Sequence, residues 1–60
     1  MLKIIMFVLA INSGDVSAIE SHEFDSMDSC IIAAIIENDI AADKSANVVH
    51  VCEYVEELEA

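Results

Sequence analysis

Two histidines stand beside groups with which they could transfer a proton or bind a metal ion. His22 directly precedes Glu23, a pair of the kind that general acid–base catalysis uses. His50 precedes Cys52 by two positions, so on a strand both side chains share one face and could form a Cys–His nucleophile or hold a metal together. A nucleophile also needs a pocket and a pair of oxyanion donors. Because 60 residues leave little room for either, we expect no enzyme, no cofactor and no metal site.

The chain's two cysteines, Cys30 and Cys52, are 22 positions apart. This spacing fits no zinc motif, which needs four ligands in short clustered pairs. One pair of cysteines is also far from the dense framework of small secreted scaffolds. We expect both to be reduced and buried, although the spacing leaves a disulfide between them open.

Carboxylates are the most abundant chemically active groups. Twelve acidic residues against two lysines give a formal net charge of −10. The sequence has no Asp-x-Asp-x-Asp-Gly run, which excludes an EF-hand calcium loop. The acidic residues are Asp15, Glu20, Glu23, Asp25, Asp28, Glu37, Asp39, Asp43, Glu53, Glu56, Glu57 and Glu59.

This charge balance excludes some classes of partner and favours others. Lys3 and Lys44 are the only basic side chains apart from histidine, which excludes direct binding to nucleic acid and disfavours an anionic membrane surface. The carboxylates could serve solubility alone. They could also attract a basic partner, such as the nucleic-acid groove of another protein, in which carboxylates take the place of phosphates.

The length predicts one small domain that spans residues 1–60. A chain of this size buries roughly 60% of its unfolded surface, so its core must be thin. Apolar residues nevertheless make up 57% of the sequence, which is too many for a disordered chain.

The first half of the chain predicts a β-hairpin. Residues 2–11 are apolar at consecutive positions, which is typical of a strand at the centre of a sheet. Asn12-Ser13-Gly14-Asp15 is the strongest turn signal and contains the only glycine. A weakly alternating strand follows at about 16–24. We expect Val16, Ala18 and Phe24 on one of its faces and Ser17, Ser21 and Glu23 on the other.

The second half predicts a helix and a strand. Asp25 or Ser26 can cap a helix over about 26–43, and Lys44 suits its negative end. Residues 47–55 are β-rich, and an acidic tail follows at 56–60. The fold class is therefore α+β, a β-β-α-β layer in which one helix covers a three-stranded antiparallel sheet of order 2-1-3.

The helix has two apolar faces. We expect one to be buried, and Ile32, Ile36 and Ile40 to stand in water on nearly the opposite side. These three are scattered surface residues, or the helix is broken near Asn38 and its second half is rotated, or they form a surface that binds a second copy or another protein. The face expected to be buried consists of Met27, Cys30, Ile31, Ala34, Ile35, Ala41 and Ala42.

The N-terminus allows two interpretations. Lys3 and the apolar run 4–11 resemble a short signal peptide, with a cleavage site after Ala18. Cleavage there would remove the most hydrophobic segment, and the apolar run is far too short to span a bilayer. We therefore expect an intact cytoplasmic chain. A secreted peptide processed after Ala18 is the alternative.

The order of motifs resembles small proteins of uncharacterised phage and prophage families. The resemblance is carried by the apolar start, the turn at 12–15, Phe24-Asp25-Ser26 leading through Cys30 into a helix, and the late Cys52. It implies no site residues. It implies a viral setting, in which small acidic proteins inhibit host machinery by binding, as anti-restriction and anti-CRISPR proteins do.

These features together predict a non-enzymatic phage inhibitor of a host defence or nucleic-acid-handling protein. It would act by surface occlusion or nucleic-acid mimicry. The alternative is a homodimer that uses the helix as its own interface. The residues that we expect to bind the partner are Ile32, Ile36, Ile40, Glu37, Asp39, Asp43, Glu53, Glu56 and Glu57.

Overall fold

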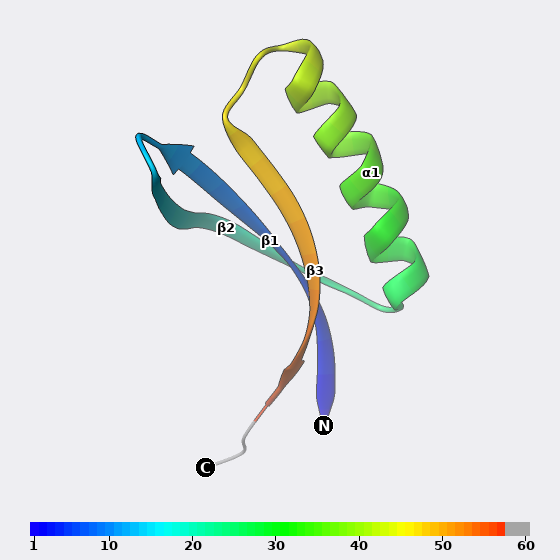
Figure 1. Cartoon of the computed structure of the whole chain (residues 1–60). Helices are drawn as coiled ribbons and strands as arrows, with labels where there is room; N and C mark the ends of the chain where they lie inside the picture. Colours follow the sequence, from blue (N-terminus) through cyan, green and yellow to red (C-terminus); the bar gives the residue numbers. More distant parts are fainter. Residues whose placement is uncertain (58–60) are drawn as a thin grey trace.

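The central strand organises the fold. In this computed structural model, which describes residues 1–57, strand β1 (Leu2–Asn12) pairs antiparallel with β2 (Asp15–Phe24) on one side and with β3 (Val48–Glu56) on the other (Figure 1). Helix α1 (Met27–Asp43) connects β2 to β3. The sheet order β2-β1-β3 and the α+β layout confirm the prediction.

The hairpin turn lies at Asn12–Asp15, as the sequence predicts. Ser13 and Gly14 both have positive φ, at 50° and 89°. Positive φ at both central residues is typical of a type I′ turn, whose twist matches that of the flanking strands. Glycine takes this conformation without strain.

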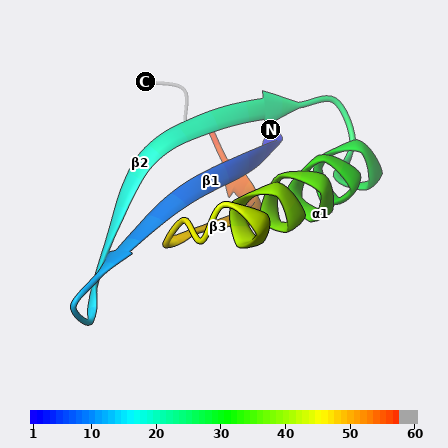
Figure 2. The ribbon, with the colours of Figure 1, turned by 90° about the horizontal axis from the view of Figure 1, so that it is seen from above.

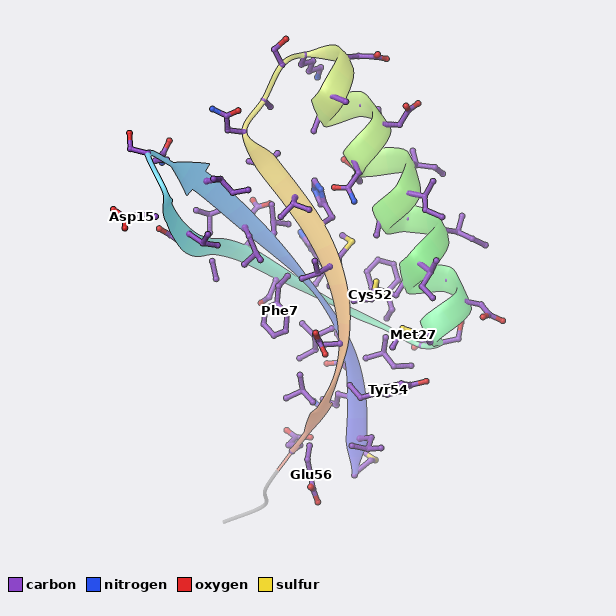
Figure 3. All side chains as sticks on the ribbon, viewed as in Figure 1. Phe7, Asp15, Met27, Cys52, Tyr54 and Glu56 are labelled. Carbon is purple, nitrogen blue, oxygen red and sulfur yellow. A yellow bond between two sulfur atoms is a disulfide. The ribbon has the colours of Figure 1, made fainter. Side chains whose placement is uncertain are left out.

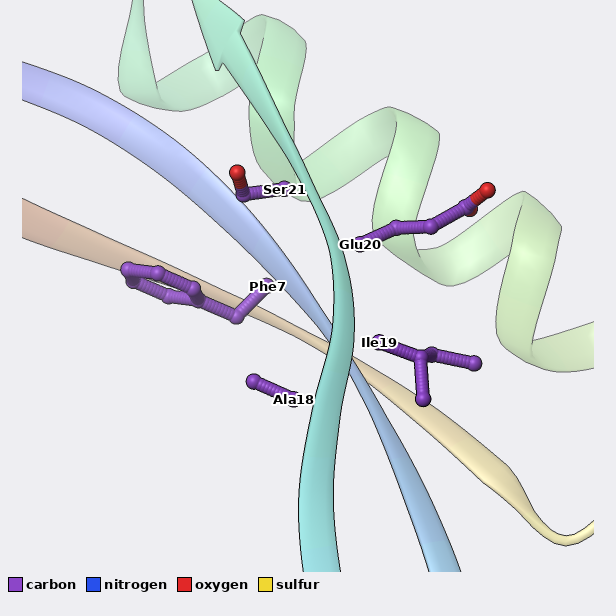
Figure 4. Close-up of a pocket in the computed structure, with 5 residues that line it drawn as sticks. All are labelled: Phe7, Ala18, Ile19, Glu20 and Ser21. Carbon is purple, nitrogen blue, oxygen red and sulfur yellow. The ribbon is translucent and has the colours of Figure 1, made fainter.

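A bulge in β2 reverses part of the expected face assignment. Val8 pairs with Glu20 and Leu9 with Ala18, so Ile19 has no partner in the register. Figure 4 shows Phe7, Ala18 and Ser21 on one side of β2 and Ile19 and Glu20 on the other. The extra residue shifts the alternation by one. Val16 and Ala18 therefore share a face with Ser21 and Glu23, while Ser17 shares the opposite face with Phe24, and the prediction was wrong on this point.

The core lies between α1 and one face of the sheet. Ile4, Met6 and Val8 of β1 point to this face, and Phe24 packs against the cluster from the end of β2. Figure 2 shows that α1 runs alongside β3 and away from β2. The core is thin, as expected, and its buried apolar residues within 1–57 are Met6, Val8, Cys30, Ala34 and Ala41.

Both ends of α1 are capped. The Ser26 hydroxyl accepts a hydrogen bond from the Ser29 backbone N–H at 3.1 Å, so Ser26 is the N-cap. After the C-cap Lys44, Ser45 adopts a φ of 56°, and its N–H donates to the Ala42 carbonyl. This left-handed residue ends the helix. The acidic tail expected at 56–60 starts with the last residue of β3, and residues 58–60 lie outside the described part of the chain.

A disulfide joins Cys30 of α1 to Cys52 of β3, so the expectation of two reduced cysteines was wrong. Cys30 is fully buried, as expected, and Cys52 is half-buried. Cys30 lies on the inner side of the helix, and Cys52 points to the same sheet face as its neighbour Met6. Two separate elements thus bring together residues that their spacing alone could not pair.

We expect reduction of this disulfide to lower the free energy of unfolding by about 3 kcal/mol, because the bond closes a loop of 22 residues in the unfolded chain. A domain of this length has only about 3–9 kcal/mol in total. Urea unfolding with and without reductant measures the difference. Iodoacetamide applied without reductant should add no mass. An unchanged midpoint, or alkylation of the native chain, would contradict the bond's role.

A peptide that spans residues 19–60 should show no cooperative thermal unfolding by circular dichroism. It lacks all of β1 and the first part of β2, so β3 has no neighbour with which to form the sheet. The full chain is the control. Cooperative unfolding of the peptide would show that a product of cleavage after Ala18 has a fold of its own.

Candidate functional site

Helix α1 is fixed to the outer edge of β3 by Asn38. Its Oδ1 accepts a hydrogen bond from the His50 backbone N–H at 2.7 Å, and its Nδ2 donates to the His50 carbonyl at 3.1 Å. The side-chain amide therefore pairs with His50 as a neighbouring strand would. It covers part of an edge that could otherwise pair with another chain. This explains the polar residue that interrupts the apolar residues of the helix.

The same amide orients the imidazole of His50. A backbone N–H only donates and a carbonyl only accepts, so the orientation of the Asn38 amide is settled by its two backbone partners. His50 Nδ1 lies 2.9 Å from Asn38 Oδ1 and must donate to it. In the neutral ring, Nε2 is then the acceptor.

Helix α1 presents a broad apolar surface to solvent. Ile32, Ile36 and Ile40 stand in water as predicted, but Ile31 and Ile35 are also exposed rather than buried. The reason is the close docking of α1, which contacts the sheet through Cys30, Ala34 and Ala41 and so buries only a narrow stripe. Met27 is half-buried and Ala42 exposed. We call the following side chains, which are between 41% and 63% exposed, the isoleucine surface: Ile31, Ile32, Ile35, Ile36 and Ile40.

The isoleucine surface is hollowed and acidic towards its C-terminal end. A shallow hollow of about 540 Å³ is lined there by Ile35, Ile36, Ile40 and Asp39, together with Asn38 and Ala42. The 17 residues of α1 include Asp28, Glu37, Asp39 and Asp43 but no Lys or Arg. An apolar side chain that enters the hollow therefore meets negative charge beside it.

The structure separates the acidic residues that the sequence grouped as one binding surface. Asp39 and Asp43 lie on α1 with the isoleucines, whereas Glu37 lines a cleft on the sheet side of the helix. Glu53 pairs with Ile5 on the sheet face that α1 does not cover. Glu56 ends β3, and Glu57 forms an ion pair with Lys3.

The histidine pairs that the sequence singled out are arranged differently. His22 Nε2 lies 3.7 Å from Glu20, while Glu23 pairs with Lys3 on the opposite sheet face. His50 and Cys52 do share a strand face, but the Cys52 sulfur is bonded to Cys30 and offers no thiolate in this state.

A cleft of about 290 Å³ beside α1 brings both histidines near two carboxylates. Met6, Val8, Glu20, His22, Glu37 and His50 line it. Within residues 1–57, no three His, Cys, Asp or Glu side chains are arranged to hold a metal ion. The spacing of the sequence could not have shown this cleft, since its lining residues come from β1, β2, α1 and β3. Figure 2 shows that α1 leaves β2 uncovered.

Lys3 forms ion pairs with a glutamate near the end of β2 and with one directly after β3. Its Nζ lies 3.1 Å from Glu57 and 3.4 Å from Glu23. Hydrogen bonds to Glu57 and then Glu23, together with their charges, raise the pKa of the Lys3 ammonium above its usual value. The stabilisation is therefore present at neutral pH and is lost only as the pH rises through that raised pKa.

Comparisons with known proteins found no match. Neither a protein-family model, nor a curated protein, nor a solved structure matches the chain. Within the described residues, no helix combines the length and the apolar character that crossing a bilayer requires.

Asn38→Ala should lower the free energy of unfolding by about 1–3 kcal/mol, because it removes two hydrogen bonds to a half-buried strand backbone. Asn38→Asp should also destabilise, since a carboxylate cannot donate to the His50 carbonyl. Urea unfolding measures both. Asn47→Ala, at an exposed position before β3, is the matched control and should change little. Equal effects at positions 38 and 47 would contradict the edge-pairing role.

Proposed function

We propose that this chain is a non-enzymatic binding protein whose isoleucine surface docks on a basic surface of another protein. The observation that carries the proposal is the combination of five exposed isoleucines with carboxylates, and no basic residue, on one helix. Solubility explains the acids but not the isoleucines. A partner that supplies apolar side chains beside Lys or Arg satisfies both.

The apolar contact supplies affinity. Fully burying an isoleucine is worth about 1.5–3 kcal/mol, and each of these side chains still has 41% or more of its area in water. Asp39, beside the hollow, and Asp43, one turn further along α1, supply the charge that selects a basic partner. Electrostatic attraction of this kind speeds association and weakens as salt is added.

The biological setting that we propose is inhibition of a host defence or nucleic-acid-handling protein by a phage-encoded chain. The acidic isoleucine surface supports occlusion of a basic groove, and the phage setting is supported by the motif resemblance alone. A cytoplasmic location stays a prediction. The Cys30–Cys52 bond does not favour it, because disulfides persist chiefly in oxidising compartments.

Capture from a host lysate tests the proposal with two matched variants. Ile36→Gln alters the isoleucine surface, and Ile19→Gln alters an equally exposed isoleucine on β2; the wild-type side chains are 53% and 56% exposed. Both keep the net charge. We expect Ile36→Gln to weaken binding of the captured protein about tenfold and Ile19→Gln to leave it unchanged.

The charge is tested separately with Asp39→Asn combined with Asp43→Asn. This variant should bind the same protein with a smaller salt dependence, because two of the carboxylates near the isoleucine surface are removed. Mass spectrometry identifies what is captured. If no basic or nucleic-acid-binding protein is retained at low or high salt, or if both glutamine variants behave alike, the proposal fails.

A further inference from the structure

The sheet has a second apolar surface, on the side that α1 leaves uncovered. Figure 3 shows Phe7 on the side of the sheet away from the helix. The pairing register places alternate residues of β1 and β3 beside it, each half-buried by its neighbours within the sheet. We call this surface the open sheet face; its half-buried apolar residues on β1 and β3 are Ile5, Phe7, Leu9, Val49, Val51 and Val55.

Charge is confined to one end of the open sheet face. Lys3 lies there with Glu23 and Glu57, to which it is ion-paired, and Glu53 lies opposite Ile5. Between Phe7 and the hairpin turn, the residues that share this face carry no charge. They are Phe7, Leu9, Ile11, Val16, Ala18, Ser21, Val49 and Val51. This end of the face therefore differs from the acidic outer side of α1.

We propose that two copies of this chain bind each other through the open sheet face. An uncharged apolar surface has nothing that selects a basic partner, but it is complementary to itself. Three strands about 4.8 Å apart and roughly 30 Å long project about 430 Å². The outer side of α1, about 25 Å by 10 Å, projects only about 250 Å².

The larger surface suits the needs of a dimer. Two opposed sheet faces remove about 860 Å² in projection, and protruding side chains increase the accessible area. The total comes close to ~1,000 Å², the lower limit for a specific interface. The isoleucine surface would fall well short of this area and would bring Asp39 and Asp43 of both copies together.

A two-fold axis that makes the strands of the two copies antiparallel satisfies the charges as well. Each Lys3 end then faces the part of the other copy's open sheet face that carries no charge, and the glutamates of the two copies stay apart. Packed sheets with nearly aligned strands form an ordinary β-sandwich core. This arrangement covers the thin sheet and leaves the isoleucine surface free.

The dependence of the dimer on salt concentration distinguishes it from binding of a basic protein. Each copy carries a net charge of −10, so the copies repel one another at long range while their contact is apolar. Added salt screens the repulsion and should strengthen the dimer. Binding of a basic protein at the isoleucine surface should weaken under the same change. The proposed dimer and the proposed binding of a basic protein can therefore be disproved independently.

Sedimentation of the disulfide-bonded chain, from micromolar to millimolar concentration and at low and high salt, tests the inference with matched variants. Val51→Lys places a cation in the open sheet face, and Ile36→Lys places the same cation on the isoleucine surface. Both change the net charge equally. We expect a wild-type dimer, at least a tenfold higher dissociation constant for Val51→Lys, and no loss of dimer for Ile36→Lys.

Circular dichroism checks that Val51→Lys is folded. If it is not, Val51→Thr decides in its place, because threonine keeps the β-branched shape and strand preference while reducing apolar contact. A wild-type monomer throughout, a higher oligomer, or a dimer that Ile36→Lys disrupts and the position-51 variants do not would overturn the inference. So would a dimer that salt weakens.

Discussion

The docking of α1 against β3 determines which surfaces of the molecule remain available. The Cys30–Cys52 bond and the Asn38–His50 hydrogen bonds hold the helix at the outer edge of this strand. Both constraints act through short side chains, so the helix lies close and buries only a narrow stripe. The isoleucines on its other sides stay in solvent, and β2 stays largely uncovered. A helix centred on the sheet would have buried more of both.

Much of the fold could be predicted because it follows from local composition. Segment 2–11 is apolar on both faces of the strand, so it required the central position in the sheet. Asn12-Ser13-Gly14-Asp15 required a turn, and these two constraints together determine the sheet order. Ser26, the N-cap, was one of the two capping residues that the sequence offered, the other being Asp25. The predicted strand and helix bounds agree with the structure to within one residue at each end.

The errors arise where one element depends on another. The unpaired Ile19 shifts the faces of β2, yet nothing in its own sequence distinguishes it from its neighbours. The disulfide needs the helix phase and the β3 register at once. The candidate site was divided for a similar reason. The sequence already placed Asp39 on the helix and Glu53 on a strand, but only the strand register puts Glu53 on the sheet face that α1 does not cover.

The two uncovered surfaces differ in how charge and apolar area are distributed, so the occupants that we propose for them differ too. The isoleucine surface has carboxylates within and beside it, so a second copy would bring like charges into contact, whereas a basic protein neutralises them. The open sheet face has its charges paired around Lys3 at one end, so a second copy fits without that cost. The net charge of −10 is therefore not a uniform property of the surface. The carboxylates of α1 oppose contact between two copies of the helix, and the dimer that we propose therefore uses the sheet.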